Sequence, residues 1–341
     1  MERNSRRRTG YRFGDRTTRT SRLASLLIGA AALIPFFPAA GARGRDASMR
    51  LSGANTPPMT IPGTQLTGAG AFMGPVRAVA VDGVRLAYRQ FGHGPDLLMI
   101  TGDTAPMSLW MPYLLRPLAR HFRVTIFDNR GVGYSTDNPS VALSIPLMAK
   151  DTVGLIRALG LRRATVLGWS MGGEIGLTMA ELYPHAFARL VITGGDAGSK
   201  HTVPPPAGLL AELSNPNAGP EVVLRLLFPA TRAGKRATER FLRGYESIPQ
   251  EQVSTTTLAR QQQAESAFLR YGRTWAGLRS IRMPVLITNG ALDYGVPPIN
   301  AKRLHHEIHG SKLTIYAGAA HGMLFQDAAA FAHEVIRFAR A

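Results

Sequence analysis

The sequence predicts an α/β fold: a mostly parallel sheet that opens with an antiparallel hairpin, has helices on both faces and carries a helical insertion. Three observations predict it. Short apolar runs alternate with helical stretches from Val76 onward, the pair Asp82-Gly83 separates the first two runs, and the alternation stops between residues 197 and 282. Strands that alternate with helices form a parallel sheet covered on both faces.

The predicted strands begin with a hairpin. Residues 76–81 and 84–91 flank Asp82-Gly83, a pair that favours the type I′ turn of a two-residue hairpin. Later apolar runs have the length of buried strands. These runs are 96–100, 123–127, 164–167, 190–193, 285–288 and 313–316.

Helical stretches lie between these runs. Gly160 and Pro184 each follow such a stretch, where residues of these types commonly end a helix. The predicted helices of the core are 109–120, 144–159, 171–183, 298–308 and 322–340.

The stretch 197–282 has helical periodicity and lacks a strand-like run. Its predicted helices are 206–213, 220–227, 235–245 and 255–272. This stretch begins after the predicted strand at 190–193, at the carboxyl edge of the sheet, where α/β proteins bind ligands. We therefore expect a helical lid over 197–282, and an α/β core made of 76–196 and 283–341.

Residues 1–42 have the order of a secretory signal peptide. Residues 1–22 contain eight Arg and two acidic residues, residues 23–34 are a short apolar run, and Ala40-Gly41-Ala42 has the small-x-small spacing of a cleavage site. An apolar run of this length is too short to span a bilayer core of about 30 Å as a helix. The pattern predicts export to the periplasm or the outside, with no membrane span left after processing.

An alternative explanation of the N-terminus is an over-extended start. Translation from Met49 or Met59 would give a cytoplasmic product. In either case residues 43–75, which are rich in Gly, Pro, Thr and Ser, are expected to be a flexible leader.

The formal net charge is +18, from 40 Lys and Arg against 22 Asp and Glu. The predicted lid is itself basic, with 12 basic and 6 acidic residues. No basic run is interleaved with aromatic residues and no zinc-finger or RNP pattern occurs, so no nucleic-acid partner is predicted. We interpret the charge as a solvated basic surface, with attraction to polyanions or membrane surfaces as the alternative. The absence of Cys excludes a disulfide framework, thiolate metal sites and a Cys nucleophile.

The candidate nucleophile is Ser170, in Gly168-Trp169-Ser170-Met171-Gly172. This G-x-S-x-G pattern follows the apolar run at 164–167 and opens the helix at 171–183. A Ser on such a sharp strand-to-helix turn projects at the helix N-terminus, where developing negative charge is stabilised. The competing interpretation is a Gly-rich helix start with a capping Ser.

A Ser hydroxyl needs a base, and the base needs an acid that orients it. His321, in Gly318-Ala319-Ala320-His321-Gly322, follows one predicted strand, and Asp293 follows another. Asp196 is the alternative acid, but it opens a Gly-rich exit that suits a hinge into the lid. His305 and His309 are four residues apart and could seat a metal, but no third ligand is evident. No metal site is predicted.

Two backbone N–H groups are expected to stabilise the oxyanion. One belongs to Met171, the residue after the nucleophile, and the other to Asp103 in the loop Thr101-Gly102-Asp103-Thr104. The Asp103 carboxylate must then point away from the developing charge.

Together these segments resemble the α/β-hydrolase superfamily, in particular its lid-bearing branch of serine esterases, lactonases and carbon–carbon hydrolases. The matching segments are Phe127-Asp128-Asn129-Arg130-Gly131-Val132-Gly133-Tyr134-Ser135, the Ser170 elbow, and the Asp293 and His321 segments. The resemblance covers 76–341. One departure is Thr101-Gly102 after the third strand, where this family often has His-Gly.

The leading hypothesis is a serine hydrolase of esters, lactones or related activated carbonyls, in which Ser170, His321 and Asp293 form a catalytic triad and an acyl-enzyme is an intermediate. An alternative is hydrolysis of a carbon–carbon bond in β-diketone-like substrates. A different class is a non-enzymatic receptor for a small ligand on the same fold. The partner is a small-molecule substrate and no cofactor is required. No pattern fixes the oligomeric state.

Overall fold

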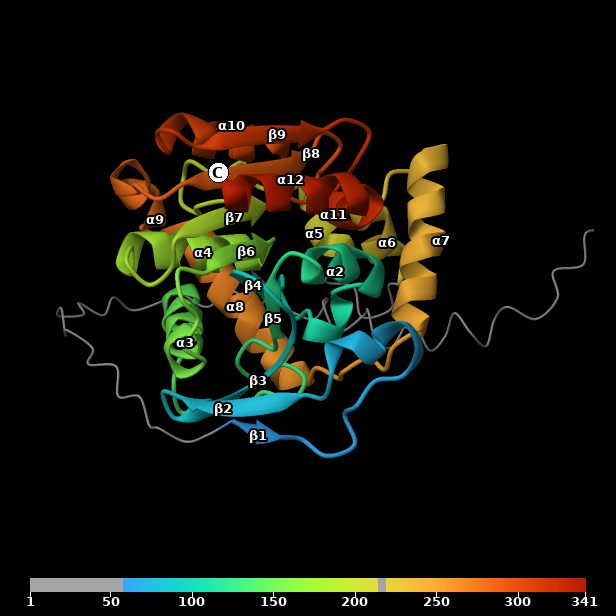
Figure 1. The fold of residues 1–341 in the computed structure, drawn as a ribbon. Coiled ribbons are helices and arrows are strands. Elements are labelled where there is room, and N and C mark those ends of the chain that lie inside the picture. Colours follow the sequence, from blue (N-terminus) through green and yellow to red (C-terminus); the bar gives the residue numbers. More distant parts are fainter. Residues whose placement is uncertain (1–57, 214–218) are drawn as a thin grey trace, which may run out of the picture.

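The computed structural model describes residues 58–213 and 219–341, so the expected signal peptide lies outside the described residues. Across the described residues nine strands form one sheet in the order β1-β2-β3-β5-β4-β6-β7-β8-β9 (Figure 1). The pairs β1/β2, β2/β3 and β3/β5 are antiparallel, and the other pairs are parallel. The strands are β1 (Met59–Thr60), β2 (Arg77–Val81), β3 (Val84–Gly92), β4 (Asp96–Ile100), β5 (Arg123–Phe127), β6 (Thr165–Trp169), β7 (Arg189–Thr193), β8 (Val285–Gly290) and β9 (Lys312–Tyr316).

Helices cover both faces of the sheet, so the predicted fold class is confirmed. The helices of the core are α2 (Pro112–Ala119), α3 (Ile145–Ala158), α4 (Met171–Leu182), α10 (Pro298–Glu307), α11 (Met323–Gln326) and α12 (Ala328–Arg340). Short 3₁₀ helices are η2 (Gly68–Met73), η3 (Met107–Leu109) and η4 (Leu278–Ser280). Among the described helices, none combines the length and apolar character that a membrane crossing requires.

The hairpin between β2 and β3 forms where Asp82-Gly83 predicts it. Val81 pairs with Val84, which leaves two residues in the loop. Asp82 has φ 44° and Gly83 has φ 81°. A type I′ turn needs positive φ at both central positions, and Asp and Gly accept this conformation better than most residues.

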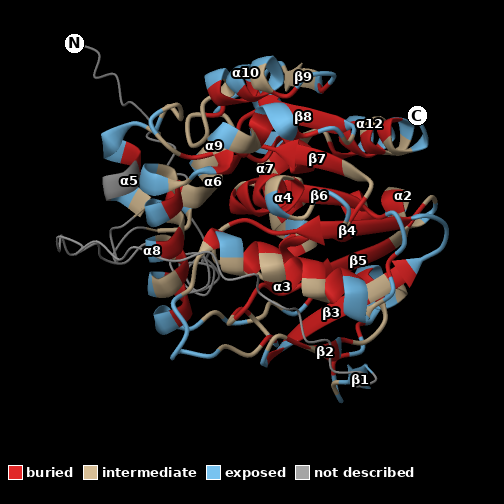
Figure 2. Ribbon diagram, turned by 90° about the vertical axis from the view of Figure 1, so that its left-hand side faces the viewer, coloured by how far each residue is buried: buried red, intermediate tan, exposed pale blue. Residues whose placement is uncertain are grey.

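Two hydrophobic cores lie on opposite faces of the sheet because successive strand residues point to opposite sides. In β4, Leu97 and Met99 face one core, and Leu98 and Ile100 face the other. The first core is closed by α2, α11, α12 and also α7, and the second by α3, α4, α8 and α10. Figure 2 shows the central strands as a buried band between exposed helix faces.

Part of the stretch expected to be a flexible leader is ordered. β1 pairs with β2, and η2 follows it. The reason is burial: Met73 and Val76 lie in the first core, and Thr64 Oγ1 accepts a hydrogen bond from the Val76 N–H at 2.9 Å. The sequence of this stretch is dominated by Gly, Pro and Thr, so its few buried apolar residues did not predict an ordered segment.

The helical insertion connects β7 to β8. Its helices are α5 (Ala207–Leu213), α6 (Glu221–Leu227), α7 (Arg232–Glu246), α8 (Thr255–Tyr271) and α9 (Thr274–Gly277). In Figure 2, α5, α6 and α8 lie beyond one end of the strands. Because the insertion leaves from the end of β7, this is the carboxyl end of the parallel strands, where the candidate site residues also lie.

Candidate active site

Ser170 occupies a strained turn between β6 and α4. Its φ is 57° and its ψ is −126°, a conformation that L-residues rarely adopt. The turn is held by the Ser170 N–H, which donates to Thr193 O at 2.9 Å, and by Ser170 O, which accepts from the Gly173 N–H at 2.7 Å. The backbone thus presents the Ser170 side chain at the carboxyl edge of the sheet.

The glycines two residues before and after Ser170 are required by close backbone contacts. A Cβ on Gly168 would collide with the backbone of Gly172, and a Cβ on Gly172 would collide with Ile100 O. Gly102 is similar on the other side of the nucleophile, since a Cβ there would lie 3.0 Å from Ser170 Cβ and 3.5 Å from Ser170 Oγ. The loop after β4 therefore packs directly against the Ser170 side chain.

His321 and Asp293 form a buried pair. His321 Nδ1 lies 2.8 Å from Asp293 Oδ2, and both side chains are almost fully buried. Because a carboxylate only accepts hydrogen bonds, Nδ1 carries the proton of this contact. In the neutral ring Nε2 then keeps its lone pair, as a general base requires.

The Asp293 carboxylate is held by its own loop. Oδ1 accepts from the Gly295 N–H at 3.0 Å and the Val296 N–H at 2.9 Å, and Asn289 Nδ2 lies 3.4 Å from Oδ2. These donors satisfy the buried carboxylate and leave Oδ2 directed at His321. The short loop after β8 thus supplies a rigid acceptor.

Two consecutive glycines bring the nucleophile and the His–Asp pair together. A Cβ on Gly194, which has φ 56°, would lie 3.1 Å from His321 Nδ1. A Cβ on Gly195 would lie 3.1 Å from Ser170 O. The exit from β7 therefore has to be free of side chains, because the His321 ring packs on one glycine and the elbow on the next.

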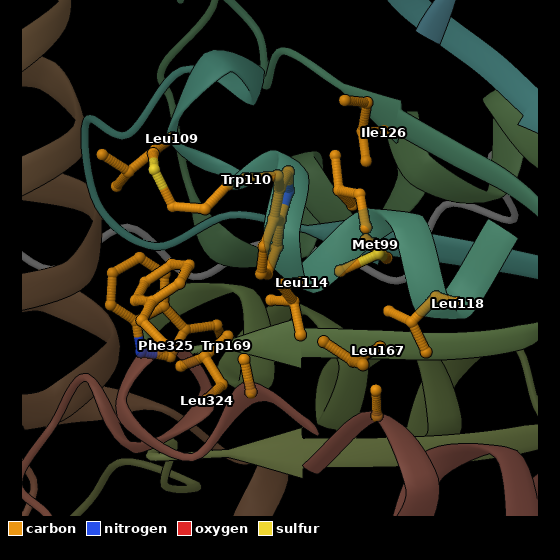
Figure 3. Close-up of a cluster of buried hydrophobic side chains, with 14 of the residues drawn as sticks. Met99, Leu109, Trp110, Leu114, Leu118, Ile126, Leu167, Trp169, Leu324 and Phe325 are labelled. Atoms are coloured by element: carbon orange, nitrogen blue, oxygen red, sulfur yellow. The ribbon is translucent and has the colours of Figure 1, made fainter. Parts of the chain in front are cut away.

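Trp169 connects the His321 loop to the nucleophile strand. Its Nε1 donates to His321 O at 3.1 Å, and its ring centroid lies 5.6 Å from that of His321. The Trp169 ring also packs edge-on against Phe325 at 5.3 Å and near Trp110 at 6.2 Å. Figure 3 shows Trp169, Trp110 and Phe325 among the side chains of the first hydrophobic core.

Asp196, the alternative acid, is not paired with His321. Its Oδ1 accepts from the Gly198 N–H at 2.8 Å and from Thr202 Oγ1 at 3.1 Å, within its own loop. Burial raises the pKa of Asp196 above its ordinary value. The structure thus brings Asp293, and not Asp196, to the imidazole.

The predicted oxyanion donors lie on either side of Ser170. Met171 is the first residue of α4, where a helix leaves its N–H groups without intrahelical acceptors. In the described part of the chain no hydrogen-bond acceptor is recorded for the Asp103 N–H. The next residue, Thr104, has φ 52° and donates its N–H to Gln261 Oε1 at 2.8 Å. Helix α8 therefore holds the shape of this loop, a role that no sequence pattern predicts.

The segment that begins at Asp128 fixes the other end of the same loop. Asp128 Oδ1 accepts from the Met107 N–H at 2.8 Å, and Oδ2 accepts from the Tyr134 N–H at 2.9 Å. Arg130 makes two hydrogen bonds of 2.7 and 2.6 Å to the Asp151 carboxylate, and both side chains are buried. This segment supports the site without reaching Ser170.

The insertion contacts the site at two places. Gln261 on α8 holds the loop after β4, and the end of α6 binds the His321 loop. There the His321 N–H donates to Leu226 O at 3.3 Å, and the Gly322 N–H donates to Leu227 O at 2.8 Å. The insertion is thus hydrogen-bonded to the loop that carries Asp103 and Thr104 and to the loop that carries His321.

No cluster of His, Asp and Glu side chains within residues 58–213 and 219–341 is arranged to bind a metal ion. His305 instead places Nδ1 2.9 Å from Ser311 Oγ. Two further acidic residues were not found from the sequence: Glu174, one turn after Ser170, and Glu265, which interacts electrostatically with Glu174. The spacing of Glu174, four residues after Ser170 on one helix face, was the available signal.

Comparison with known proteins identifies the same architecture. A family model described as the alpha/beta hydrolase fold matches residues 95–328. The human serine hydrolase BPHL is 26% identical over 256 residues, which cover 72% of this chain and 79% of the human protein. An alpha/beta hydrolase fold protein from Chitinophaga pinensis has a TM-score of 0.69 at 26% identity, covering 77% of this chain and 96% of that chain. The esterase RhEst1 from Rhodococcus sp. ECU1013 has a TM-score of 0.63 at 26% identity, covering 77% of this chain and 98% of that chain.

Proposed function

The chain belongs to the alpha/beta hydrolase fold family, and from that premise we propose that it is a serine hydrolase of carboxylic esters, lactones or related activated carbonyls. The observation that carries the proposal is the buried His321–Asp293 pair at 2.8 Å, beside a Ser170 held at φ 57°. A buried, oriented imidazole near a half-buried serine on a strained turn is the arrangement that acyl transfer needs. The serine hydrolase BPHL and the esterase RhEst1, both similar to this chain, support the same chemistry.

In the proposed reaction, Ser170 Oγ attacks the substrate carbonyl carbon and passes its proton to His321 Nε2. Asp293 stabilises the imidazolium that forms and keeps the ring in its orientation. The carbonyl oxygen becomes an oxyanion between the N–H groups of Met171 and Asp103. His321 then gives the proton to the leaving alcohol. In the second half of the reaction, water attacks the acyl carbon while His321 Nε2 takes a proton from it. His321 returns this proton to Ser170 Oγ as the carboxylic acid leaves.

The insertion between β7 and β8 acts as a lid in this proposal. The insertion binds the Thr104 N–H and the His321 N–H, so closure of the lid also positions the loops that carry Asp103 and His321. A closed lid excludes water from the acyl-enzyme until the leaving group has departed, and it strengthens the electrostatic interactions inside.

The test is a panel of esters, thioesters, lactones and β-diketones, run on the wild type and on Ser170→Ala. We expect turnover of at least one carboxylic ester or lactone, and a loss of about three orders of magnitude or more in Ser170→Ala, since the nucleophile is deleted. Equal ester turnover in both proteins would remove Ser170 from the mechanism. Turnover of β-diketones alone would favour carbon–carbon bond hydrolysis.

A further inference from the structure

Three carboxyl side chains converge behind the nucleophile, from three different elements. Asp103 follows Gly102, which is so close to the nucleophile that a Cβ added there would lie 3.5 Å from Ser170 Oγ. Glu174 lies one helical turn after Ser170 on α4, and its N–H lies 3.4 Å from Ser170 O. Glu265 lies on α8, one turn after Gln261, which binds the Thr104 N–H. The three carboxyl groups come from α4, the loop after β4 and the insertion, and they lie near enough to repel one another electrostatically.

Two of these carboxyl groups have a buried oxygen atom without a hydrogen-bond partner. Glu174 is only 3% exposed, and its Oε2 has no protein partner. Asp103 Oδ1 is buried and unpaired in the same way. A buried polar atom of this kind costs free energy unless something binds it. The unpaired oxygens therefore indicate a group that the protein itself does not supply.

No basic side chain of the described residues pairs with this cluster, since none of the ion pairs there involves Asp103, Glu174 or Glu265. Burial, together with the neighbouring carboxyl groups, raises the pKa of Glu174 and of Glu265 well above their ordinary values. Burial raises the pKa of Asp103 to about 7. Among residues 58–213 and 219–341, no Lys or Arg forms an ion pair with this cluster.

The chemistry of the cluster selects the class of ligand. The described residues offer no arrangement of three ligands for direct coordination of a metal ion. A primary ammonium group carries three N–H donors and one positive charge, so it satisfies several carboxyl oxygens at once with charge-assisted hydrogen bonds. Glu174 lies one helical turn after Ser170, and Asp103 follows Gly102, which packs against the Ser170 side chain. An ammonium group bound by these carboxyl groups would therefore belong to the substrate that Ser170 attacks.

We propose that Asp103, Glu174 and Glu265 recognise an ammonium group of the substrate, so that the enzyme prefers esters that carry a protonated amine. This inference rests on the proposed function, because it names the substrate class of the same site. Asp196 adds negative potential, but its carboxylate is bound within its own loop. The ammonium group stabilises the ionised carboxyls, so its binding releases protons from them.

The test compares esters in which only a methyl group replaces the ammonium group. One pair is alanine ethyl ester and ethyl 2-methylpropanoate, with the amine on the acyl side. The other is trans-4-aminocyclohexyl acetate and trans-4-methylcyclohexyl acetate, with the amine on the alcohol side. The ratio of kcat/KM within each pair is measured at about pH 6, where the amines are protonated. Dividing the wild-type ratio by that of a variant cancels the intrinsic reactivity of each ester.

We expect the wild-type kcat/KM ratio of the ammonium ester to its methyl counterpart to be about tenfold or more, in at least one pair. This ratio is taken after division by the ratio of the rates at which hydroxide alone hydrolyses the same two esters. Glu174→Gln and Glu265→Gln should each lower that ratio about tenfold, because the amide keeps the size of the side chain and removes its charge. Glu239→Gln is the matched control, since Glu239 is exposed on α7 and its ratio should stay at the wild-type value. A wild type without this preference in either pair, or an unchanged ratio in every cluster variant that folds, would overturn the proposal.

The two proposals fail in different ways. If the neutral esters are cleaved by Ser170 and the ammonium esters are not preferred, the cation site falls and the proposed function stands. If no ester is cleaved, the proposed function falls, and binding decides the cation site. In that case isopropylammonium chloride should raise the Tm of the wild type more than that of Glu174→Gln at matched ionic strength. Equal shifts in both proteins would refute the site.

Discussion

The orientation of His321 depends on one carboxylate oxygen. Asp293 Oδ2 is directed at Nδ1 because backbone N–H groups hold Oδ1. An amide in place of the carboxylate would present either an N–H₂ donor or a neutral oxygen to the ring. The donor would favour the tautomer with a proton on Nε2, which cannot accept the proton of Ser170.

We therefore expect Asp293→Asn to lower ester turnover by up to about 10⁴-fold, through loss of the correct tautomer and of the imidazolium partner. Asp196→Asn should lose far less on a neutral ester, since the Asp196 carboxylate contacts Gly198 and Thr202 and not the imidazole. Steady-state kinetics of both variants on the same neutral ester measure the difference. The opposite order would show that Asp196 orients the base.

The residues of the proposed triad could be found in the sequence because each follows a strand. Ser170, Asp293 and His321 stand directly after apolar runs, and parallel strands bring their carboxyl ends to one edge. Glu265 and Gln261 could not be found in this way. They lie on a helix of the insertion, and Gln261 binds a residue 157 positions away, a contact that no local pattern predicts.

At the scale of elements, α4 and β4 approach so closely that only glycine fits between them. A Cβ on Gly172 would meet the backbone of Ile100, which cannot move without disturbing the parallel pairing of β4 with β6. Gly208 is the matched control, because it lies on an exposed helix with open space around its Cβ position. The two glycines differ in their surroundings and share a helical backbone.

Gly172→Ala should lower the free energy of unfolding by about 2 kcal/mol or more, as overpacking does, and should also reduce turnover by displacing the elbow. Gly208→Ala should keep its stability or gain a few tenths of a kcal/mol, because Ala is the better helix former. Denaturant melts of both variants provide the measurement. A Gly172→Ala variant as stable as the wild type would contradict the close packing described here.

Helix α8 supports the oxyanion loop through Gln261, whose Oε1 accepts from the Thr104 N–H at 2.8 Å. Gln261→Ala removes this acceptor, so Thr104 would lose a restraint on its positive φ and the Asp103 N–H would be less well placed. We expect kcat to fall about tenfold or more, in line with the loss of an oxyanion donor. Gln263→Ala, at an exposed position two residues later, is the control and should keep its kcat. Equal kcat values in the two variants would show that the Gln261 contact with Thr104 does not contribute to catalysis.

The predicted elements of the core match the structure closely, whereas α9 and β1 were not predicted. Both are short: α9 is Thr274–Gly277 and β1 is Met59–Thr60. Elements of this length carry no usable periodicity, and they form because neighbouring packed segments impose their conformation. The order of the strands in the sheet likewise depends on contacts between segments that are distant in sequence.

For the molecule as a whole, acidic groups are concentrated inside and basic groups outside. Among the described residues, the buried acidic side chains are Asp96, Asp128, Asp151, Glu174, Asp196 and Asp293, whereas the buried arginines are Arg89 and Arg130. The surface of the described part is therefore more basic than the composition suggests, as Lys and Arg outnumber Asp and Glu overall. The interior is where titration should affect stability.

Burial raises the pKa of Asp128, Glu174 and Glu265 well above their ordinary values. A carboxyl with a raised pKa binds a proton in the folded state at pH values where the unfolded chain has lost it. Its contribution to stability is complete below the unfolded pKa of about 4 and is lost as the pH rises toward the folded pKa. The native state should therefore lose stability on this account between pH 5 and pH 8.

Glu174→Gln removes one of these titrations, because an amide does not ionise. The Tm of this variant should fall less between pH 5 and pH 8 than that of the wild type. Glu239→Gln, an exposed change of the same chemistry, should reproduce the wild-type fall. Thermal melts across this range provide the comparison. A fall in Glu174→Gln as large as in the wild type would show that the Glu174 carboxyl titrates normally.

If Ser170 is a nucleophile activated by His321, a reagent that reacts with activated serines should form its covalent adduct at this residue. The protein is treated with a fluorophosphonate, digested, and the modified residue is identified by mass spectrometry, with Ser170→Ala and His321→Ala treated in parallel. We expect one phosphonate on Ser170 in the wild type, none in Ser170→Ala, and much slower labelling of His321→Ala. An adduct at another residue, or labelling of Ser170→Ala at the wild-type rate, would show that Ser170 is not the nucleophile.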